Sequence, residues 1–171
     1  MAYRARTYIA GDWTGDENLI SALQYWNESS FWGISFSDAH ELTQARDTSL
    51  PCSIKKSLKA RLDASKTFVL IVGENTRNLT KGGCRYCRSY SVYGGCHRPG
   101  VVDHRSFIEY ECDYASESCM KVVILYNSCY IDRDKCPDSL SHMGRHLAAV
   151  YRGLDGSYYW DVDAIKQAIC D

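Results

Sequence analysis

Three features are scarce in this sequence: long apolar runs, an imbalance of charge, and segments that could act as linkers. The longest unbroken runs of aliphatic or aromatic residues, Phe68–Val72 and Val122–Tyr126, are much too short to span a bilayer. The formal net charge is -1, so the chain lacks the basic field on which non-specific nucleic-acid binding depends. We therefore expect neither a membrane nor a nucleic acid among its partners.

No segment is rich enough in Pro, Gly or Ser to divide the 171 residues, and no internal repeat is visible. We therefore predict a single domain over residues 1–171. The opening residues Met1–Arg6 carry charge, but no apolar stretch follows them, so we expect no secretory signal and a cytoplasmic protein. In that compartment the nine cysteines should be mainly reduced thiols.

The two apolar runs predict buried strands. Their apolar residues do not alternate with polar ones, which is typical of parallel strands covered on both faces. Weaker strand candidates are Thr7–Ala10, Gly33–Phe36 and Leu147–Tyr151. Apolar residues at helical spacing predict helices near 19–26, 51–62, 107–117 and 162–169. Strands that alternate with helices predict an α/β, flavodoxin-like, three-layer fold with a central, mostly parallel five-stranded sheet.

Residues 74–103, approximately, form one long Cys-, Tyr- and Gly-rich loop with little helical or strand pattern. Loops of this length in compact domains are usually functional or disordered. Three cysteines and a histidine in it have a C-x2-C-x8-C-H spacing that suits structural zinc: Cys84, Cys87, Cys96 and His97. Because a second Cys-x-x-Cys pair is absent, reduced thiols are the favoured interpretation and no metal is assigned.

Glu111 is unusual in the helix predicted over residues 107–117. At about 100° per residue it falls within the apolar arc of that helix, with Ile108 and Cys112. The other acids lie on the opposite side: Glu109, Asp113 and Glu117. Burying a carboxylate is costly without a partner or a function, so Glu111 is the first candidate for a catalytic residue. The structural alternative is an acid at the edge of the core, paired with Arg105 or a tyrosine hydroxyl.

Polar residues follow the predicted strands. Ligands of such sheets bind beyond the carboxyl ends of the strands, so the loops there should converge on one rim. These loops begin after Ala10, Phe36, Val72 and Tyr126. The candidate binding residues on or near them are Asp12, Asp38, His40, Arg46 and Thr76. Such side chains suit a polar, hydroxyl-rich or phosphorylated ligand. Structural interpretations remain open: the aspartates as turn caps, Arg46 as a surface ion pair, and the nearby Trp13 as a packing residue.

These residues resemble a known family. Four segments are similar to the TIR-like proteins whose best-known members are the TIR subunits of Thoeris antiphage defence. They are Phe36–His40, Arg46–Asp47, Ser53–Leu58 and Arg61–Leu70. Ile108–Ala115 resembles the TIR helix that bears the catalytic glutamate. The resemblance runs from about Tyr8 to Tyr126 and equates that glutamate with Glu111.

The resemblance implies an enzyme of NAD glycohydrolase or ADP-ribosyl cyclase type, with NAD as its substrate. It would release nicotinamide and make a cyclic or modified ADP-ribose signal for a separate effector, and a homo-oligomer is left open. Glu111 would stabilise positive charge on the ribose, while Asp38, His40 and Arg46 would position ribose, phosphate or the attacking group. Two alternatives stay open: a non-catalytic TIR-like signalling adaptor, and a nucleoside deoxyribosyltransferase-like enzyme that exchanges bases on deoxynucleosides.

Overall fold

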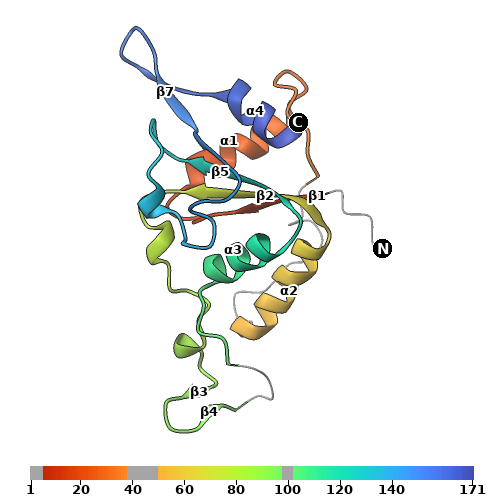
Figure 1. Ribbon diagram of the computed structural model, residues 1–171, viewed down its shortest axis with the longest axis vertical. Coiled ribbons are helices and arrows are strands. Elements are labelled where there is room, and N and C mark those ends of the chain that lie inside the picture. The colour runs from red at the N-terminus through yellow and green to blue at the C-terminus, as the bar shows by residue number, and fades with distance from the viewer. Residues whose placement is uncertain (1–5, 38–49, 98–101) are drawn as a thin grey trace.

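The computed structural model describes residues 6–37, 50–97 and 102–171 (Figure 1). Its main elements are β1 (Arg6–Ala10), α1 (Glu17–Glu28), α2 (Pro51–Asp63), β2 (Ser65–Val72), α3 (Phe107–Glu117), β5 (Lys121–Tyr126), β6 (Arg145–Ala148) and α4 (Val162–Cys170). Shorter elements are β3 (Tyr90–Ser91), β4 (Gly95–Cys96), β7 (Val150–Arg152), β8 (Tyr158–Trp160) and the 3-10 turns η2 (Thr76–Asn78), η3 (Cys84–Tyr86) and η4 (Arg133–Lys135). Strands and helices alternate over most of the chain, as the sequence predicts.

A parallel sheet in the order β1-β2-β5-β6 forms the middle layer. Successive side chains of a strand point to opposite faces, so β1 sends Tyr8 and Ala10 to one core and Ile9 to the other. Helices α2 and α3 cover the first face, and α1 and α4 cover the second (Figure 1). The predicted α/β, flavodoxin-like, three-layer fold is therefore confirmed.

The central sheet has four strands in the described residues, and the predicted number of five was wrong. The candidate Gly33–Phe36 is not a strand, although the next residue, Ser37, accepts a hydrogen bond from the Thr7 N–H at 2.8 Å. The Asn27 side chain accepts a hydrogen bond from the Phe36 N–H at 2.8 Å, and Gly33 has a φ of 64°. These local interactions take the place of the backbone hydrogen bonds that a strand would form with β1. The segment therefore lies beside β1, at the edge where a flavodoxin-like sheet adds a strand, without becoming a strand itself.

The candidate strand 147–151 is divided between two sheets. β6 ends at Ala148, and the N–H of Ala149 still donates to the Tyr126 carbonyl at 2.8 Å. The chain then leaves the central sheet, because β7 pairs with β8 as an antiparallel hairpin. The sequence pattern located the apolar residues correctly but did not show the change of partner.

Residues 74–103 are here called the Cys-rich loop, and the described part of this loop extends away from the layered body (Figure 1). It contains η2, η3 and the small β3–β4 hairpin. The end of the loop lies beside η3, since the Cys84 N–H donates to the Asp103 carbonyl at 2.9 Å. The loop returns to the body next to the start of α3.

Helices α2, α3 and α4 begin where local chemistry predicts. Pro51 occupies the first turn of α2, where its missing N–H removes no helical bond. Ser106 and Glu109 form a reciprocal capping box at the start of α3, and Asp161 caps α4 through the Ala164 N–H. No helix within the three described ranges has the length and apolar character needed to cross a membrane.

Candidate functional site

Glu111 lies on the buried side of α3, facing the sheet and α2. Its side chain is 6% exposed, and Ile108, Cys112 and Ala115 are buried with it on the same stripe. Glu109 and Glu117, by contrast, are exposed. The position inferred from helical periodicity is therefore confirmed, and the capping box at Ser106 fixes the helix that presents the carboxylate.

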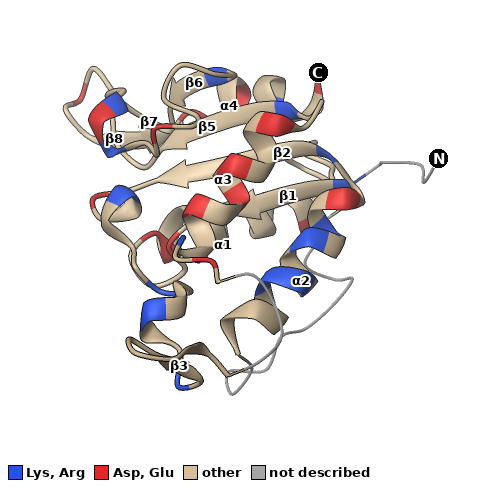
Figure 2. Cartoon of the chain, turned by 60° about the horizontal axis from the view of Figure 1, so that its bottom comes forward, with Lys and Arg blue, Asp and Glu red and all other residues tan. Residues whose placement is uncertain are grey.

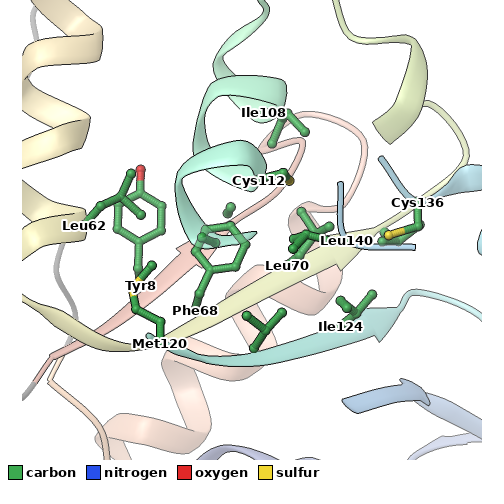
Figure 3. Close-up of a cluster of buried hydrophobic side chains, with 14 of the residues drawn as sticks. Tyr8, Leu62, Phe68, Leu70, Ile108, Cys112, Met120, Ile124, Cys136 and Leu140 are labelled. Atoms are coloured by element: carbon green, nitrogen blue, oxygen red, sulfur yellow. The ribbon is translucent and has the colours of Figure 1, made fainter. Parts of the chain in front are cut away.

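Tyr8 of β1 donates a hydrogen bond from its hydroxyl to Oε1 of Glu111. Figure 3 shows the Tyr8 ring rising from the sheet beside Leu62 of α2 and Phe68 of β2. A tyrosine hydroxyl is one of the two partners that the structural alternative expected for Glu111. The other, Arg105, bonds instead to Asp103 and Asp113. Glu111 is thus a satisfied buried acid that also faces a cavity.

The cavity beside Glu111 has a volume of about 450 Å³. Its walls come from the loop after β1, from α2, from the Cys-rich loop and from α3. The lining residues are Ala10, Gly11, Asp12, Trp13, Thr14, Ile54, Leu58, Arg61, Leu79, Lys81, Phe107, Ile108 and Glu111. An apolar wall with a few convergent charged groups is the usual form of a small-molecule site.

Charged residues of both signs line this cavity. α2 displays mainly basic residues and α3 mainly acidic ones (Figure 2). Arg61, 7% exposed on α2, is close enough to interact electrostatically with Glu111. Lys81 is an exposed cation at the same cavity, and Asp12 is a second carboxylate. The cavity can therefore contact both an anionic group and a hydroxyl-bearing or cationic group.

Burial raises the pKa of Glu111 to about 7, and the hydrogen bond from Tyr8 and the positive charge of Arg61 partly oppose that rise. At neutral pH the carboxyl group is therefore divided between its protonated and ionised forms. A carboxyl group with a strongly perturbed pKa in a cavity is a candidate for chemistry.

Asp12 is the predicted binding residue that the structure brings to the Glu111 cavity. Its Oδ1 also accepts a hydrogen bond from the Thr14 N–H at 3.1 Å, so the turn-cap interpretation holds as well. Asp12 lines a neighbouring small cavity of about 100 Å³ with Gly73, Glu74 and Asn127. The loops after β1, β2 and β5 thus converge on one rim, as predicted.

The other candidate binding residues are not brought to this cavity by the described part of the chain. Thr76 is buried, and its hydroxyl accepts the Gly73 N–H at 2.8 Å, so it holds the turn after β2 instead of facing the cavity. Asp38, His40 and Arg46 lie outside the described residues.

Sequence reasoning missed several residues that line or support the cavity. Trp13, interpreted as a packing residue, is 46% exposed at the cavity wall. In the sequence, Tyr8 has the pattern of an ordinary strand residue, and Lys81 lies in a segment predicted to be a loop. Arg61 could have been found, because it falls on the apolar stripe of Ile54 and Leu58, the same signal that identified Glu111.

The cysteines and histidine of the zinc spacing lie in the Cys-rich loop. Within the described ranges, no three His, Cys, Asp or Glu side chains are grouped so that they could hold a metal ion. The Cys84 sulfur accepts the Asp103 N–H at 3.3 Å, and the Cys87 sulfur accepts the Ser89 N–H at 3.4 Å. All nine cysteines are free thiols.

A second cavity, of about 460 Å³, lies at the carboxyl end of β5. Its lining residues are Asn18, Asn127, Ser128, Cys129, Val150, Tyr158, Tyr159 and Trp160. None of these side chains is a carboxylate, lysine or arginine, so this cavity offers no charged group for catalysis. The Glu111 cavity is therefore the better candidate for a reaction site.

Residues 7–81 match the family described as Thoeris protein ThsB, TIR-like domain. The match covers 75 of the 171 residues, so it shows that this part of the chain is similar to that family. The matched residues include Tyr8, Asp12, Arg61 and Lys81, whereas Glu111 lies beyond the matched segment. No curated protein is similar enough to the chain to match it.

This similarity supports the predicted resemblance to the TIR-like proteins of Thoeris defence. The match ends at Lys81, where the Cys-rich loop lines the cavity, so α3 is not covered by it. The predicted correspondence of Glu111 with the TIR glutamate is therefore not tested by the match, and Glu111 lies on the buried face of the helix that precedes β5.

Proposed function

We propose that this TIR-like domain cleaves NAD between nicotinamide and ribose and that Glu111 is its catalytic residue. The observation that carries the proposal is a buried carboxylate at a cavity that also presents Arg61 and Lys81. NAD combines a pyrophosphate, two riboses and a cationic pyridinium ring. Two cations and two carboxylates around one cavity are complementary to that combination.

One carboxylate is sufficient for the chemistry. Nicotinamide leaves as a neutral base, so no acid is required to protonate it, and positive charge develops on the ribose as its bond breaks. An ionised Glu111 beside that ribose would stabilise the charge, because electrostatic stabilisation is strong in a cavity shielded from water. Asp12 would contact ribose hydroxyls, and the exposed ring of Trp13 offers a surface for stacking a base.

Arg61 and Lys81 would hold the pyrophosphate. Arg61 comes from α2 and Lys81 from the Cys-rich loop, so together they would fix the substrate from two walls. The product is a cyclic or otherwise modified ADP-ribose, according to which nucleophile attacks the ribose. In the proposed role this nucleotide acts in the cytoplasm on a separate effector of antiphage defence.

The test is nicotinamide release from NAD by the full chain, with products identified by mass spectrometry. Glu111→Gln keeps the shape and the acceptor for Tyr8 but removes the charge, so it should reduce release at least 100-fold. Glu117→Gln, which changes an exposed acid at the other end of α3, is the matched control and should keep full activity. Equal release by wild type and Glu111→Gln would refute the assignment.

A non-catalytic signalling adaptor is the second candidate. The observation in its favour is the Tyr8–Glu111 hydrogen bond, because a carboxylate with a partner does not need a reaction to explain it. An adaptor should show no thermal stabilisation by NAD or ADP-ribose. The proposed enzyme should be stabilised by both, and more weakly after Arg61 or Lys81 is changed.

A further inference from the structure

Tyr8 and Glu111 are 103 positions apart in the sequence and meet in the interior of the fold. Tyr8 is fully buried on β1, while Glu111 comes from α3 on the layer above. Tyrosine hydroxyls and glutamate carboxylates are rarely buried without a hydrogen-bond partner, and here Tyr8 and Glu111 are partners of each other. The pair is a direct link between the central sheet and the helix that carries the proposed catalytic carboxylate.

The Tyr8 ring has little freedom to move. It stacks on Phe68, with ring centroids 5.8 Å apart and an angle of 14° between the ring planes. These two residues are also paired in the parallel ladder between β1 and β2, so the ring is supported by backbone and side-chain contacts together. The hydroxyl is therefore a fixed donor, and its direction is set by the sheet.

The hydrogen bond from Tyr8 is accepted by Oε1 of Glu111, so the two carboxylate oxygens have different surroundings. An O–H donor favours the ionised form of a carboxylate and restricts its rotation. Among the described residues, the other ionisable groups around Glu111 are Arg61 on α2, Asp12 after β1, Lys81 on the Cys-rich loop and the neighbouring Cys112. The hydroxyl of Tyr8 is bonded directly to the carboxylate.

We propose that Tyr8 is the positioning residue of Glu111: its hydroxyl orients the carboxylate through Oε1 and leaves Oε2 for the ribose of the substrate. The role in turnover rests on the proposed NAD cleavage. The effect on the ionisation and orientation of Glu111 does not, and it can be measured without any reaction.

The first experiment measures the titration of the Glu111 carboxyl group in the full chain by carbon NMR, with Glu111→Gln used to assign the signal. Tyr8→Phe keeps the stacked ring and removes the donor, so the midpoint should rise by about one pH unit or more, a tenfold change in proton affinity. The matched control is Tyr114→Phe, which removes another tyrosine–carboxylate hydrogen bond, to Asp63, away from the cavity. That control should leave the Glu111 midpoint unchanged.

A second variant covers the case in which Tyr8→Phe does not fold. Site-specific replacement of Tyr8 by 3-fluorotyrosine makes the hydroxyl a stronger donor, so the midpoint should move in the opposite direction and fall. A midpoint that neither substitution moves would overturn the proposal. A shift of equal size in Tyr114→Phe would overturn it as well.

The second experiment follows nicotinamide release from NAD between pH 5 and pH 9. In Tyr8→Phe the rising limb of kcat should move to higher pH, with several-fold loss at pH 7, recovery at pH 9 and little change in KM. A merely structural role would lower activity equally at every pH. If wild type releases no nicotinamide at any pH, the proposed function fails, and the NMR titration still decides whether Tyr8 controls Glu111.

Discussion

The backbone N–H of Phe107, the first residue of α3, donates to the carbonyl of Lys81 at 2.9 Å. This bond joins the beginning of the Glu111 helix to the segment of the Cys-rich loop that lines the cavity. Gly82 follows with a φ of 108° and packs against the Phe107 ring so closely that a Cβ would lie 2.5 Å from it. The wall formed by Lys81 and the helix that presents Glu111 are therefore positioned together.

Glu111→Gln should stabilise the protein, and increasingly so as the pH rises. Burial raises the pKa of Glu111 from 4.5 to about 7 on folding, so the native state binds the proton more tightly than the unfolded state. The contribution of Glu111 to stability is thus fully present below pH 4.5 and is lost as the pH rises through about 7. Glutamine never ionises, so it avoids this loss.

The measurement is urea unfolding of wild type and Glu111→Gln at pH 5 and pH 8. The variant should gain little at pH 5 and on the order of 3 kcal/mol at pH 8, since each pKa unit corresponds to about 1.4 kcal/mol. Glu117→Gln is the control, because an exposed acid should give no such pH-dependent difference. A gain in Glu111→Gln that is the same at both pH values would contradict the buried-charge explanation.

Lys81→Met should weaken the binding of NAD without removing catalysis. Lys81 is exposed at the cavity wall, and its backbone is held by Phe107, so the substitution removes a charge and keeps the fold. We expect KM to rise roughly tenfold, the size of one lost charge-assisted hydrogen bond, with kcat nearly unchanged. The comparison is Lys66→Met, an exposed lysine of β2 outside the cavity. Similar KM values for the two variants would exclude Lys81 from the binding site.

Lys55→Met should loosen the return of the Cys-rich loop to the body. Lys55 is 5% exposed, and its Nζ donates to the Arg105 carbonyl at 2.6 Å and contacts the Asp103 carboxylate at 3.2 Å. Although burial raises the pKa of Asp103, hydrogen bonds from Arg105 and the charge of Lys55 lower it to about 2. Removing this buried cation leaves the Arg105 carbonyl and the Asp103 carboxylate without the partner that Lys55 supplies. The free energy of unfolding should therefore fall by about 1–3 kcal/mol.

Urea unfolding and limited proteolysis of the loop test the role of Lys55. The variant should unfold at lower urea and be cleaved faster between residues 74 and 103. Lys59→Met, one turn later on α2, removes an exposed ion pair with Asp63 and should cost at most about 0.5 kcal/mol. Unchanged cleavage in Lys55→Met would show that other contacts hold the loop.

Helical periodicity located Glu111 because burial along one helix is a local property that repeats with the turn. It would have located Arg61 on α2 by the same argument. The fifth strand could not be judged in this way, because a strand requires a partner that completes its ladder. At Gly33–Phe36 the Asn27 side chain took one of the necessary N–H groups.

The sequence by itself determined the two buried runs that became β2 and β5, the alternation of strands and helices, and the face of α3 on which Glu111 lies. These depend on the order of apolar residues within one element. Tertiary structure alone decided that Tyr8 bonds to Glu111, that Thr76 turns away to Gly73, and that Arg61 and Lys81 share the Glu111 cavity. Such contacts depend on strand register and helix packing, which bring together residues that no local pattern connects.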